Sequence, residues 1–208
     1  MTDRMRVRRL PEKARSDRAS LDAVLDAARV AHVALVHDGQ PVNIPVASAR
    51  DGDRLLLHGS TGSRLFRTLA DGTPACVAIT LLDGMVLARS AFESSMHYRS
   101  AVLYGTARPV ADKVAALRAM SEAWMPGRWE ELRPPTAKEL AATLVLELPI
   151  EEWSVKVSDG PPDDPESDLD APVWAGVLPV RSSYGEPVPA PDLRGDPALP
   201  AYLREWRP

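Results

Sequence analysis

Residues 55–69 read LLLHGSTGSRLFRTL, and the rest of the chain is organised around this stretch. An apolar run, typical of a buried strand, ends in a small polar turn with two glycines, and the turn leads into an apolar segment with helical spacing. A strand that enters a helix through such a turn presents unpaired backbone N–H groups, and Arg64 adds a planar guanidinium beside them. The stretch fits a phosphate-binding turn, and it fits an ordinary capped helix with an exposed arginine equally well.

The composition is that of a globular protein without a polyanionic partner. The chain has 208 residues, of which 45% are hydrophobic and 26% charged, and its formal net charge is -4. This charge gives no global attraction to nucleic acid or to an anionic membrane surface, so we expect neither as a partner. Cys76 is the single cysteine, and no apolar run approaches the ~18 residues of a membrane-spanning helix. We therefore expect a cytoplasmic protein from a reducing compartment.

Asp-Gly pairs separate most of the apolar runs that follow residue 30. Asp38-Gly39, Asp51-Gly52 and Asp83-Gly84 each stand between two such runs, and Asp-Gly in that position favours a β-hairpin. Asp71-Gly72 instead follows the helical segment and is expected to end it. The runs show little polar alternation, which predicts strands covered on both faces, as in a closed antiparallel barrel.

Three helices are predicted outside these strands. Ser20 is expected to cap the first, and Asp112 the second, which carries Met120 and Trp124 towards the core. A short third helix begins near Thr136, and an apolar strand region follows from residue 142 to residue 153.

The composition also divides the chain into three parts. Residues 1–19 are charged and without periodicity, which predicts an exposed arm, and residues 20–158 form the folded domain. Residues 159–208 hold eleven of the twenty prolines. Proline removes the backbone donor that helices and sheets need, so this part is predicted to be an extended strap that covers the barrel, a dimer partner or the site.

Residue types with obvious catalytic or metal-binding chemistry are scattered. The four histidines form neither an HxxxH pair nor a cluster with cysteine, so no metal site is predicted. A G-x-S-x-G nucleophile motif is absent as well. His97 and Tyr98 are the best candidates for proton donors, and we take them as the candidate catalytic residues.

The order of these elements resembles the pyridoxamine 5'-phosphate oxidase-like flavoproteins, and among them the branch of nitroimidazole-resistance-type (Nim-like) reductases. The resemblance covers residues 18–157 and is carried by AHVALV from Ala31, NIPV from Asn43, HGSTGSR from His58 and YRSAVLYG from Tyr98. It implies a mainly β fold with α-helices, namely an antiparallel six-stranded split β-barrel that binds FMN. Peripheral helices and the proline-rich C-terminal tail would lie outside this barrel.

The resemblance also implies roles for single residues. The strand from Asn43 to Ser48 would lie along the isoalloxazine ring, and the turn after His58 would hold the ribityl chain and the phosphate, with Arg64 paired to the phosphate. Arg99-Ser100 stands where the family has an arginine-glutamine pair, which weakens Ser100 as a ligand more than Arg99. The implied cofactor-binding residues are Asn43, Ile44, Pro45, Val46, Ser48, His58, Gly59, Ser60, Ser63, Arg64, Arg99 and Ser100.

The resulting hypothesis is a homodimeric FMN protein that reduces a small molecule, with the flavin at the subunit interface. Pyridoxamine phosphate oxidases end in an arginine- and tryptophan-bearing segment, and the tail here does not reproduce it, so vitamin B6 oxidation is not the first choice. Two alternatives stay open: an oxidoreductase that uses a deazaflavin coenzyme, and a non-catalytic module that binds a flavin or haem. Haem binding would direct attention to His58 and His97.

Overall fold

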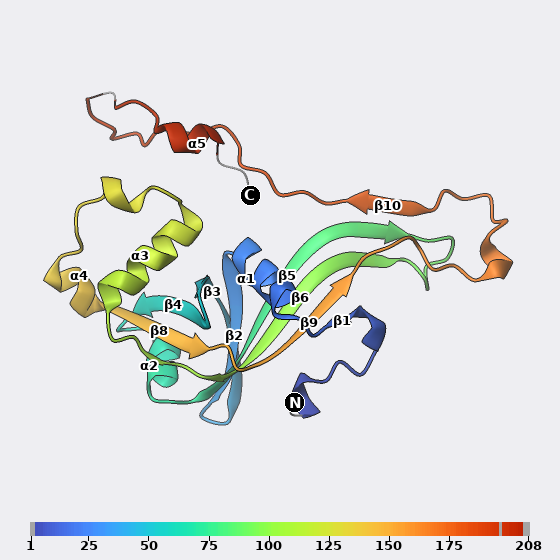
Figure 1. Cartoon of the computed structure of the whole chain (residues 1–208), viewed down its shortest axis with the longest axis horizontal. Coiled ribbons are helices and arrows are strands. Elements are labelled where there is room, and N and C mark those ends of the chain that lie inside the picture. Colours follow the sequence, from blue (N-terminus) through green and yellow to red (C-terminus); the bar gives the residue numbers. More distant parts are fainter. Residues whose placement is uncertain (1–2, 196, 206–208) are drawn as a thin grey trace.

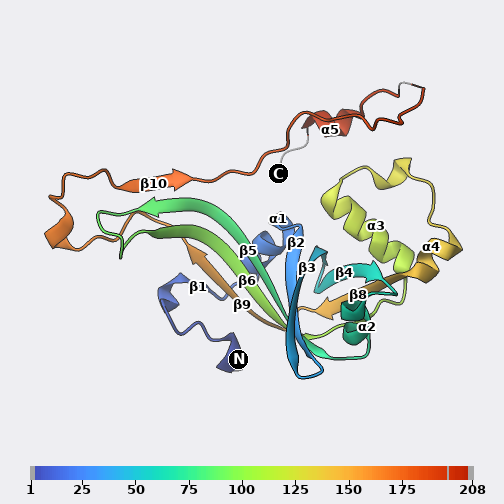
Figure 2. The same ribbon diagram turned by 180° about the vertical axis from the view of Figure 1, so that it is seen from behind.

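Ten antiparallel strands form one continuous sheet in the computed structural model of the protein, which describes residues 3–195 and 197–205 (Figures 1 and 2). The strands are β1 Ala14–Arg15, β2 Val30–His37, β3 Gln40–Asp51, β4 Arg54–Ser60, β5 Pro74–Leu87, β6 Ser95–Thr106, β7 Arg108–Pro109, β8 Thr143–Pro149, β9 Glu152–Ser158 and β10 Gly176–Pro179. The α-helices are α1 Arg18–Ala27, α2 Arg64–Ala70, α3 Lys113–Trp124, α4 Ala137–Ala142 and α5 Ala201–Glu205. Short 3-10 turns span Asp3–Met5, Pro11–Lys13, Trp129–Glu131 and Glu166–Asp168.

The strand order closes the sheet into a split barrel. The order is β1-β9-β6-β5-β2-β3-β4-β8-β7, and β10 pairs with the free part of β5. β8 runs into β9 through Ile150 and Glu151, so the chain itself joins the two strands that lie next to the ends of the path. The predicted mainly β fold with an antiparallel split barrel is confirmed.

The sheet has four more strands than the six that the sequence predicts. β1, β7 and β10 are edge strands of two to four residues, and such short runs carry no periodic signal. The predicted strand region from residue 142 to residue 153 is two strands, because the chain turns a corner after Pro149. Ile150 is buried at this corner, and its N–H donates to the carbonyl of Asp53 at 2.9 Å.

Two hydrophobic clusters lie on opposite faces of β4. Leu55 and Leu57 point into the barrel, where they join the apolar sides of α1 and α2, whereas Leu56 points outwards and packs with Met120 of α3. All three leucines are at most 1% exposed. The alternation places α2 inside one end of the barrel and α3 on its outer surface, and it explains why the Leu55–Leu57 run lacks polar residues.

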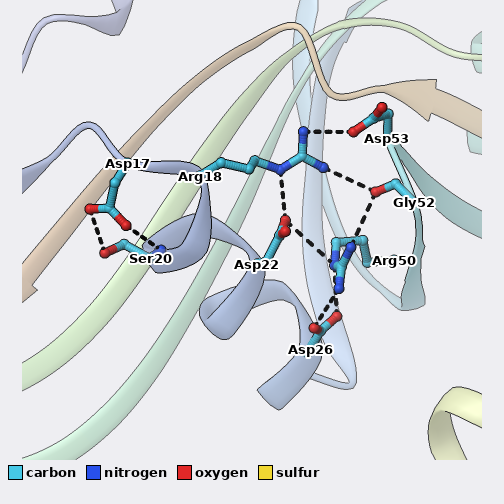
Figure 3. Close-up of polar contacts among 8 residues, drawn as sticks. All are labelled: Asp17, Arg18, Ser20, Asp22, Asp26, Arg50, Gly52 and Asp53. Atoms are coloured by element: carbon cyan, nitrogen blue, oxygen red, sulfur yellow. Dashed lines mark hydrogen bonds and ion pairs between the residues drawn. The ribbon is translucent and has the colours of Figure 1, made fainter.

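The first helix begins earlier than predicted. Asp17, not Ser20, is the N-cap: its carboxylate accepts the Ser20 N–H and the Ser20 hydroxyl, both at 2.8 Å (Figure 3). Ser20 is therefore the third helical residue. Asp112 caps α3 as predicted, and the short helix expected near Thr136 is α4, with Thr136 as its N-cap.

A network of arginines and carboxylates fastens α1 to the β3–β4 hairpin (Figure 3). Arg18 pairs with Asp22 on its own helix and with Asp53 in the hairpin turn, each at 2.7 Å. Arg50 on β3 reaches Asp26 at 2.6 Å. These pairs are largely exposed, so they fix the position of α1 more than they stabilise the fold.

Of the Asp-Gly predictions, the structure confirms all but one. Asp38-Gly39 is the two-residue turn of the β2–β3 hairpin, Asp51-Gly52 opens the β3–β4 turn, and Asp71-Gly72 ends α2 with Gly72 at a φ of +87°. The prediction of a hairpin at Asp83-Gly84 is wrong, because β5 continues through this pair with a bulge. Pairing with β6 on one edge and β10 on the other keeps the chain extended there.

The long ends of β5 and β6 form an arm that projects from the barrel, and the C-terminal tail follows it (Figure 1). After β9 the chain passes the tip of the arm and returns along its outer edge as β10, so part of the predicted strap is a regular strand. At the tip, Asp164 accepts the backbone N–H of Arg89 at 2.7 Å and pairs with its guanidinium at 2.9 Å. The tail then crosses back towards α3 and ends in α5.

Candidate functional site

β3 changes its pairing partner halfway along its length, and this change opens the barrel wall. Residues 40–47 pair with β2, whereas residues 48–51 pair with β4. After Leu57, β4 in turn pairs only with β8. One edge of β3 before Ser48 and one edge of β4 after Leu57 therefore carry backbone N–H and C=O groups without a strand partner.

The predicted strand residues lie along this open edge, on alternating faces. Ile44 and Val46 share the face of Val33 and Ala31, which are buried in the barrel. Asn43 and Pro45 share the outer face with Ala34 and His32. The side chains of β3 thus alternate between the two faces of the sheet, and only backbone groups follow one another along its unpaired edge.

Ser48 stands where β3 meets β4, and it is the buried member of the predicted set. Ser48 is only 2% exposed, and its backbone carbonyl accepts the Trp124 indole N–H at 2.8 Å. Ser48 therefore fixes the point where the strands part, and its carbonyl is already used.

The turn after β4 is held by its own serines. Ser60 Oγ accepts the Gly62 N–H at 3.1 Å, the Ser63 N–H donates to the Ser60 carbonyl at 2.9 Å, and Ser63 is the N-cap of α2. Both hydroxyls help to shape the turn, so they are positioning groups as well as predicted ligands.

Gly59 determines where α2 starts. A Cβ built on Gly59 would lie 2.4 Å from the ring of Phe66, which is 4% exposed inside the barrel end. The backbone of β4 and the Phe66 ring are thus in direct contact, and that contact fixes the start of α2, and with it Arg64, close behind the unpaired end of β4. The Arg64 side chain is exposed and makes no hydrogen bond or ion pair with any residue that the structure describes.

His58 faces away from the barrel interior, towards α3. Its ring lies 5.7 Å from the ring of Trp124, and its buried Nδ1 has no hydrogen-bond partner among the described residues. Burial lowers the pKa of His58 below its ordinary value, so the imidazole is neutral at neutral pH. The sequence suggests Trp124 only as a core residue; its contacts with His58 and Ser48 come from the tertiary structure.

The later predicted residues form a second group on β6. In the sheet order, β5, β2 and β3 lie between β6 and β4, so a single chain does not bring Arg99 and Ser100 to the His58–Arg64 turn. Arg99 is also already paired, with both Asp83 carboxylate oxygens at 2.8 and 2.9 Å. The Ser100 hydroxyl lies 3.5 Å from the Lys156 carbonyl.

The two predicted proton donors belong to this second group. His97 Nε2 lies 2.7 Å from the Gly160 carbonyl, and because a carbonyl only accepts, Nε2 carries the hydrogen and Nδ1 keeps its lone pair. Tyr98 is half-buried on the opposite face of β6.

An open groove of about 450 Å³ lies beside Asn43 on the outer face of the sheet. Its walls come from β2, β3 and β5 and include Cys76, and Tyr104 borders it under the guanidinium of Arg4 at 5.0 Å. Asn43 is the one residue of this groove that the sequence predicts as a site residue. The others were not predicted, because only the pairing of β2, β5 and β6 brings them together.

Residues 3–195 and 197–205 contain no group of three or more histidine, cysteine or acidic side chains that could hold a metal ion. Within the same part of the chain, no helix combines the length and apolarity needed to cross a membrane.

The fold defines a split-barrel protein in which parts of β3 and β4 have one edge without a strand partner. The sequence profile of the pyridoxamine 5'-phosphate oxidase family matches residues 17–157. The chain belongs to this family. A search among curated proteins found no match.

Solved structures include two relatives that match nearly the whole chain. The FAD and haem binding protein from Mycobacterium smegmatis is 49% identical, with a TM-score of 0.91 over 94% of this chain and 97% of that one. The flavocytochrome Anf3 from Azotobacter vinelandii is 41% identical, with a TM-score of 0.93 over 99% of this chain and 97% of that one.

The nitroimidazole-resistance branch is more distant than the sequence suggests. A candidate 5-nitroimidazole antibiotic resistance protein from Bacteroides thetaiotaomicron is 19% identical, with a TM-score of 0.58 over 69% of this chain and 86% of that one. This likeness concerns the fold alone. The placement in the Nim-like branch is therefore corrected to the family as a whole.

Proposed function

We propose that the protein is a redox protein of the flavocytochrome kind, which binds a flavin and a haem and acts on a small molecule. The observation that carries this proposal is the 49% identity, over nearly the whole length of both chains, to a protein described as binding FAD and haem. The flavocytochrome Anf3 supports the same reading at 41% identity. The flavin is then FAD rather than the FMN that the sequence suggested.

The open edge between β3 and β4 fits a flavin. Isoalloxazine has a polar edge that hydrogen-bonds to backbone groups, and the unpaired edge of β3 before Ser48 supplies them. Arg64, at the rim of the same opening and without a carboxylate partner, suits a phosphate. Ile44 and Val46, on the barrel side of β3, offer an apolar surface to the ring.

Two histidines fit an axial ligand of haem. His97 donates its Nε2–H to the Gly160 carbonyl and keeps the lone pair of Nδ1 free. A hydrogen bond from the second ring nitrogen is what orients the ring of metal-ligating histidines. His58 is neutral, packed against Trp124, and has one ring nitrogen without a partner. Neutral imidazole is the form that binds iron.

When bound, a flavin supplies hydride chemistry and a haem supplies one-electron chemistry. The chain itself would hold, orient and shield these groups. The rigid strand edges of β3 and β4 would fix the flavin, and the contact between Gly59 and Phe66 would keep Arg64 in register with them. Burial, which lowers the pKa of His58, would keep that imidazole neutral.

The test is the chromophore of the protein purified from cells supplied with iron and a haem precursor. We expect flavin bands together with a Soret band, and FAD as the flavin released on denaturation. His58→Ala and His97→Ala should separate the two axial candidates, because only loss of the true ligand shifts the Soret band while the flavin bands persist. His32→Ala, an exposed histidine on β2, is the matched control. A protein that binds neither flavin nor haem on titration would refute the proposal.

We also propose a homodimer, because the arm carries an apolar strip that one chain leaves open. Leu82, Met85, Met96 and Leu178 are 46%, 43%, 46% and 60% exposed. Strand register pairs Met85 with Met96 on one side and with Leu178 on the other, so the three side chains share one face of the arm. Single exposed apolar residues are common on protein surfaces, whereas a contiguous strip of this kind is typical of an interface.

Light scattering of the purified protein would test the dimer. We expect the mass of two chains, and the mass of one chain after Met85→Glu combined with Leu178→Glu. Val188→Glu, which changes an apolar residue that is 89% exposed on the tail, should leave the mass unchanged. A monomeric wild-type protein would contradict this proposal and leave the cofactor proposal standing.

A further inference from the structure

The arginines of the folded domain almost all have hydrogen-bond partners within the chain. Twelve arginines lie between residues 18 and 158, a range that the structure describes throughout. Ten of them hydrogen-bond to carboxylates or to backbone carbonyls. Arg64 and Arg67 are the two in this range without any such partner among the described residues.

These two arginines stand one turn apart on the same helix. Side chains at i and i+3 are neighbours on a helix surface, with Cβ atoms about 5–6 Å apart. α2 contains no acidic residue, and Asp71, four residues after Arg67, caps the helix end without an ion pair to it. Two adjacent guanidinium groups without a carboxylate partner make a local positive charge, and an anion beside them would relieve their mutual repulsion.

The positions of the two arginines along α2 suggest how an anion with two charged groups would lie. Arg64 follows directly on the turn at the end of β4, next to the open edge where the flavin is proposed to lie. Arg67 is about 4.5 Å farther along the helix axis and away from that edge. Figures 1 and 2 show α2 at the end of the barrel opposite the arm.

We propose that Arg64 and Arg67 together form a diphosphate subsite, in which Arg64 holds the phosphate nearer the flavin ring and Arg67 holds the second phosphate. This inference rests on the proposed flavin site. A single phosphate at the turn needs only Arg64, whereas a dinucleotide extends beyond it in the direction in which Arg67 lies. The subsite makes the chain selective for FAD over FMN, because the two guanidinium groups match two successive phosphates.

Titration of the apoprotein with riboflavin, FMN and FAD tests this subsite, because the three ligands differ in the number of phosphates. Wild type should bind FAD more tightly than FMN. Arg67→Ala should weaken FAD about tenfold or more, since a charge-assisted hydrogen bond contributes about 1.5–3 kcal/mol, and should change FMN less than about twofold. Arg64→Ala should weaken both FMN and FAD, and riboflavin should respond to neither change.

The controls separate the subsite from general charge and from misfolding. Arg118→Ala removes an exposed arginine of α3 that pairs with Glu130, and it should leave all three affinities unchanged. Arg67→Lys keeps the charge but loses the planar fork, so FAD affinity should fall less than with alanine. Riboflavin binding by each variant reports that the ring site is intact.

Two results would overturn the inference. If Arg67→Ala weakens FMN as much as FAD, both arginines serve a single phosphate. If Arg67→Ala changes neither, the pair is an exposed surface feature. Binding of FMN and FAD by the wild type in either case would leave the proposed flavin function intact, whereas a wild type that binds none of the three ligands would refute both.

Discussion

Gly59→Ala is expected to be among the most damaging single-methyl additions in this protein. The new Cβ would lie 2.4 Å from two atoms of the Phe66 ring, which cannot rotate away because Phe66 is buried at the end of the barrel. Overpacking in such a core costs about 1–3 kcal/mol, and more where backbone must move. Because α2 must shift as a unit, Arg64 and Arg67 should move with it.

Chemical denaturation and flavin titration would measure the two consequences separately. We expect a lower free energy of unfolding and weaker binding of FMN and FAD. The double variant Gly59→Ala with Phe66→Leu relieves the clash. Its loss in free energy of unfolding should therefore be smaller than the sum of the losses of the two single variants. Gly62→Ala is the matched control, since a Cβ there would meet only Ser60 Oγ, at 3.5 Å. A fully stable Gly59→Ala protein would show that α2 is not fixed by this contact.

Asp164→Asn is expected to release the tail from the arm. The Asp164 side chain is 1% exposed and accepts both the backbone N–H and the guanidinium of Arg89. Removing one partner of a buried ion pair leaves the other charge uncompensated and costs about 3–5 kcal/mol. The segment that follows, including β10, is attached to β5 by only four residues of strand pairing, so the loss should appear there as local opening.

Hydrogen exchange would locate this effect. Amides of residues 176–180 should exchange much faster in the variant, whereas those of β4 and β8 should keep their protection. Asp163→Asn changes an exposed neighbouring carboxylate and should have no effect on either group. Unchanged exchange in β10 would mean that strand pairing alone holds the tail.

Local sequence signals predicted the elements whose cause is local. Asp-Gly turns, the cap at Asp112, the helix start near Thr136 and the apolar runs each depend on a few adjacent residues, and these predictions held in the structure. The exception at Asp83-Gly84 is instructive. A turn pair remains extended there because β6 and β10, from distant parts of the sequence, pair with both edges of β5.

The candidate site was predicted less completely, for a related reason. Residues 43–47 lie on the part of β3 that pairs with β2 alone, and residues 58–60 lie on the part of β4 that pairs with β8 alone. Their role as cofactor ligands stays a prediction. Arg99 lies elsewhere in the chain and is paired with Asp83, a contact that arises only because the bulge in β5 places that carboxylate beside β6. Trp124 contacts His58 and Ser48 across the second cluster, and no local pattern reports such a contact.

The stretch LLLHGSTGSRLFRTL by itself determined a strand, a tight polar turn and a capped helix, because hydrophobic spacing, serine hydroxyls and glycine act over a few residues. The tertiary structure decided what this stretch can hold. The strand exchange of β3 left its backbone edge open, and the packing of Phe66 on Gly59 set α2 at the rim. Whether an arginine is free or paired depends on charges far away in the sequence, and for this reason Arg64 and Arg67 stand out only in the folded chain.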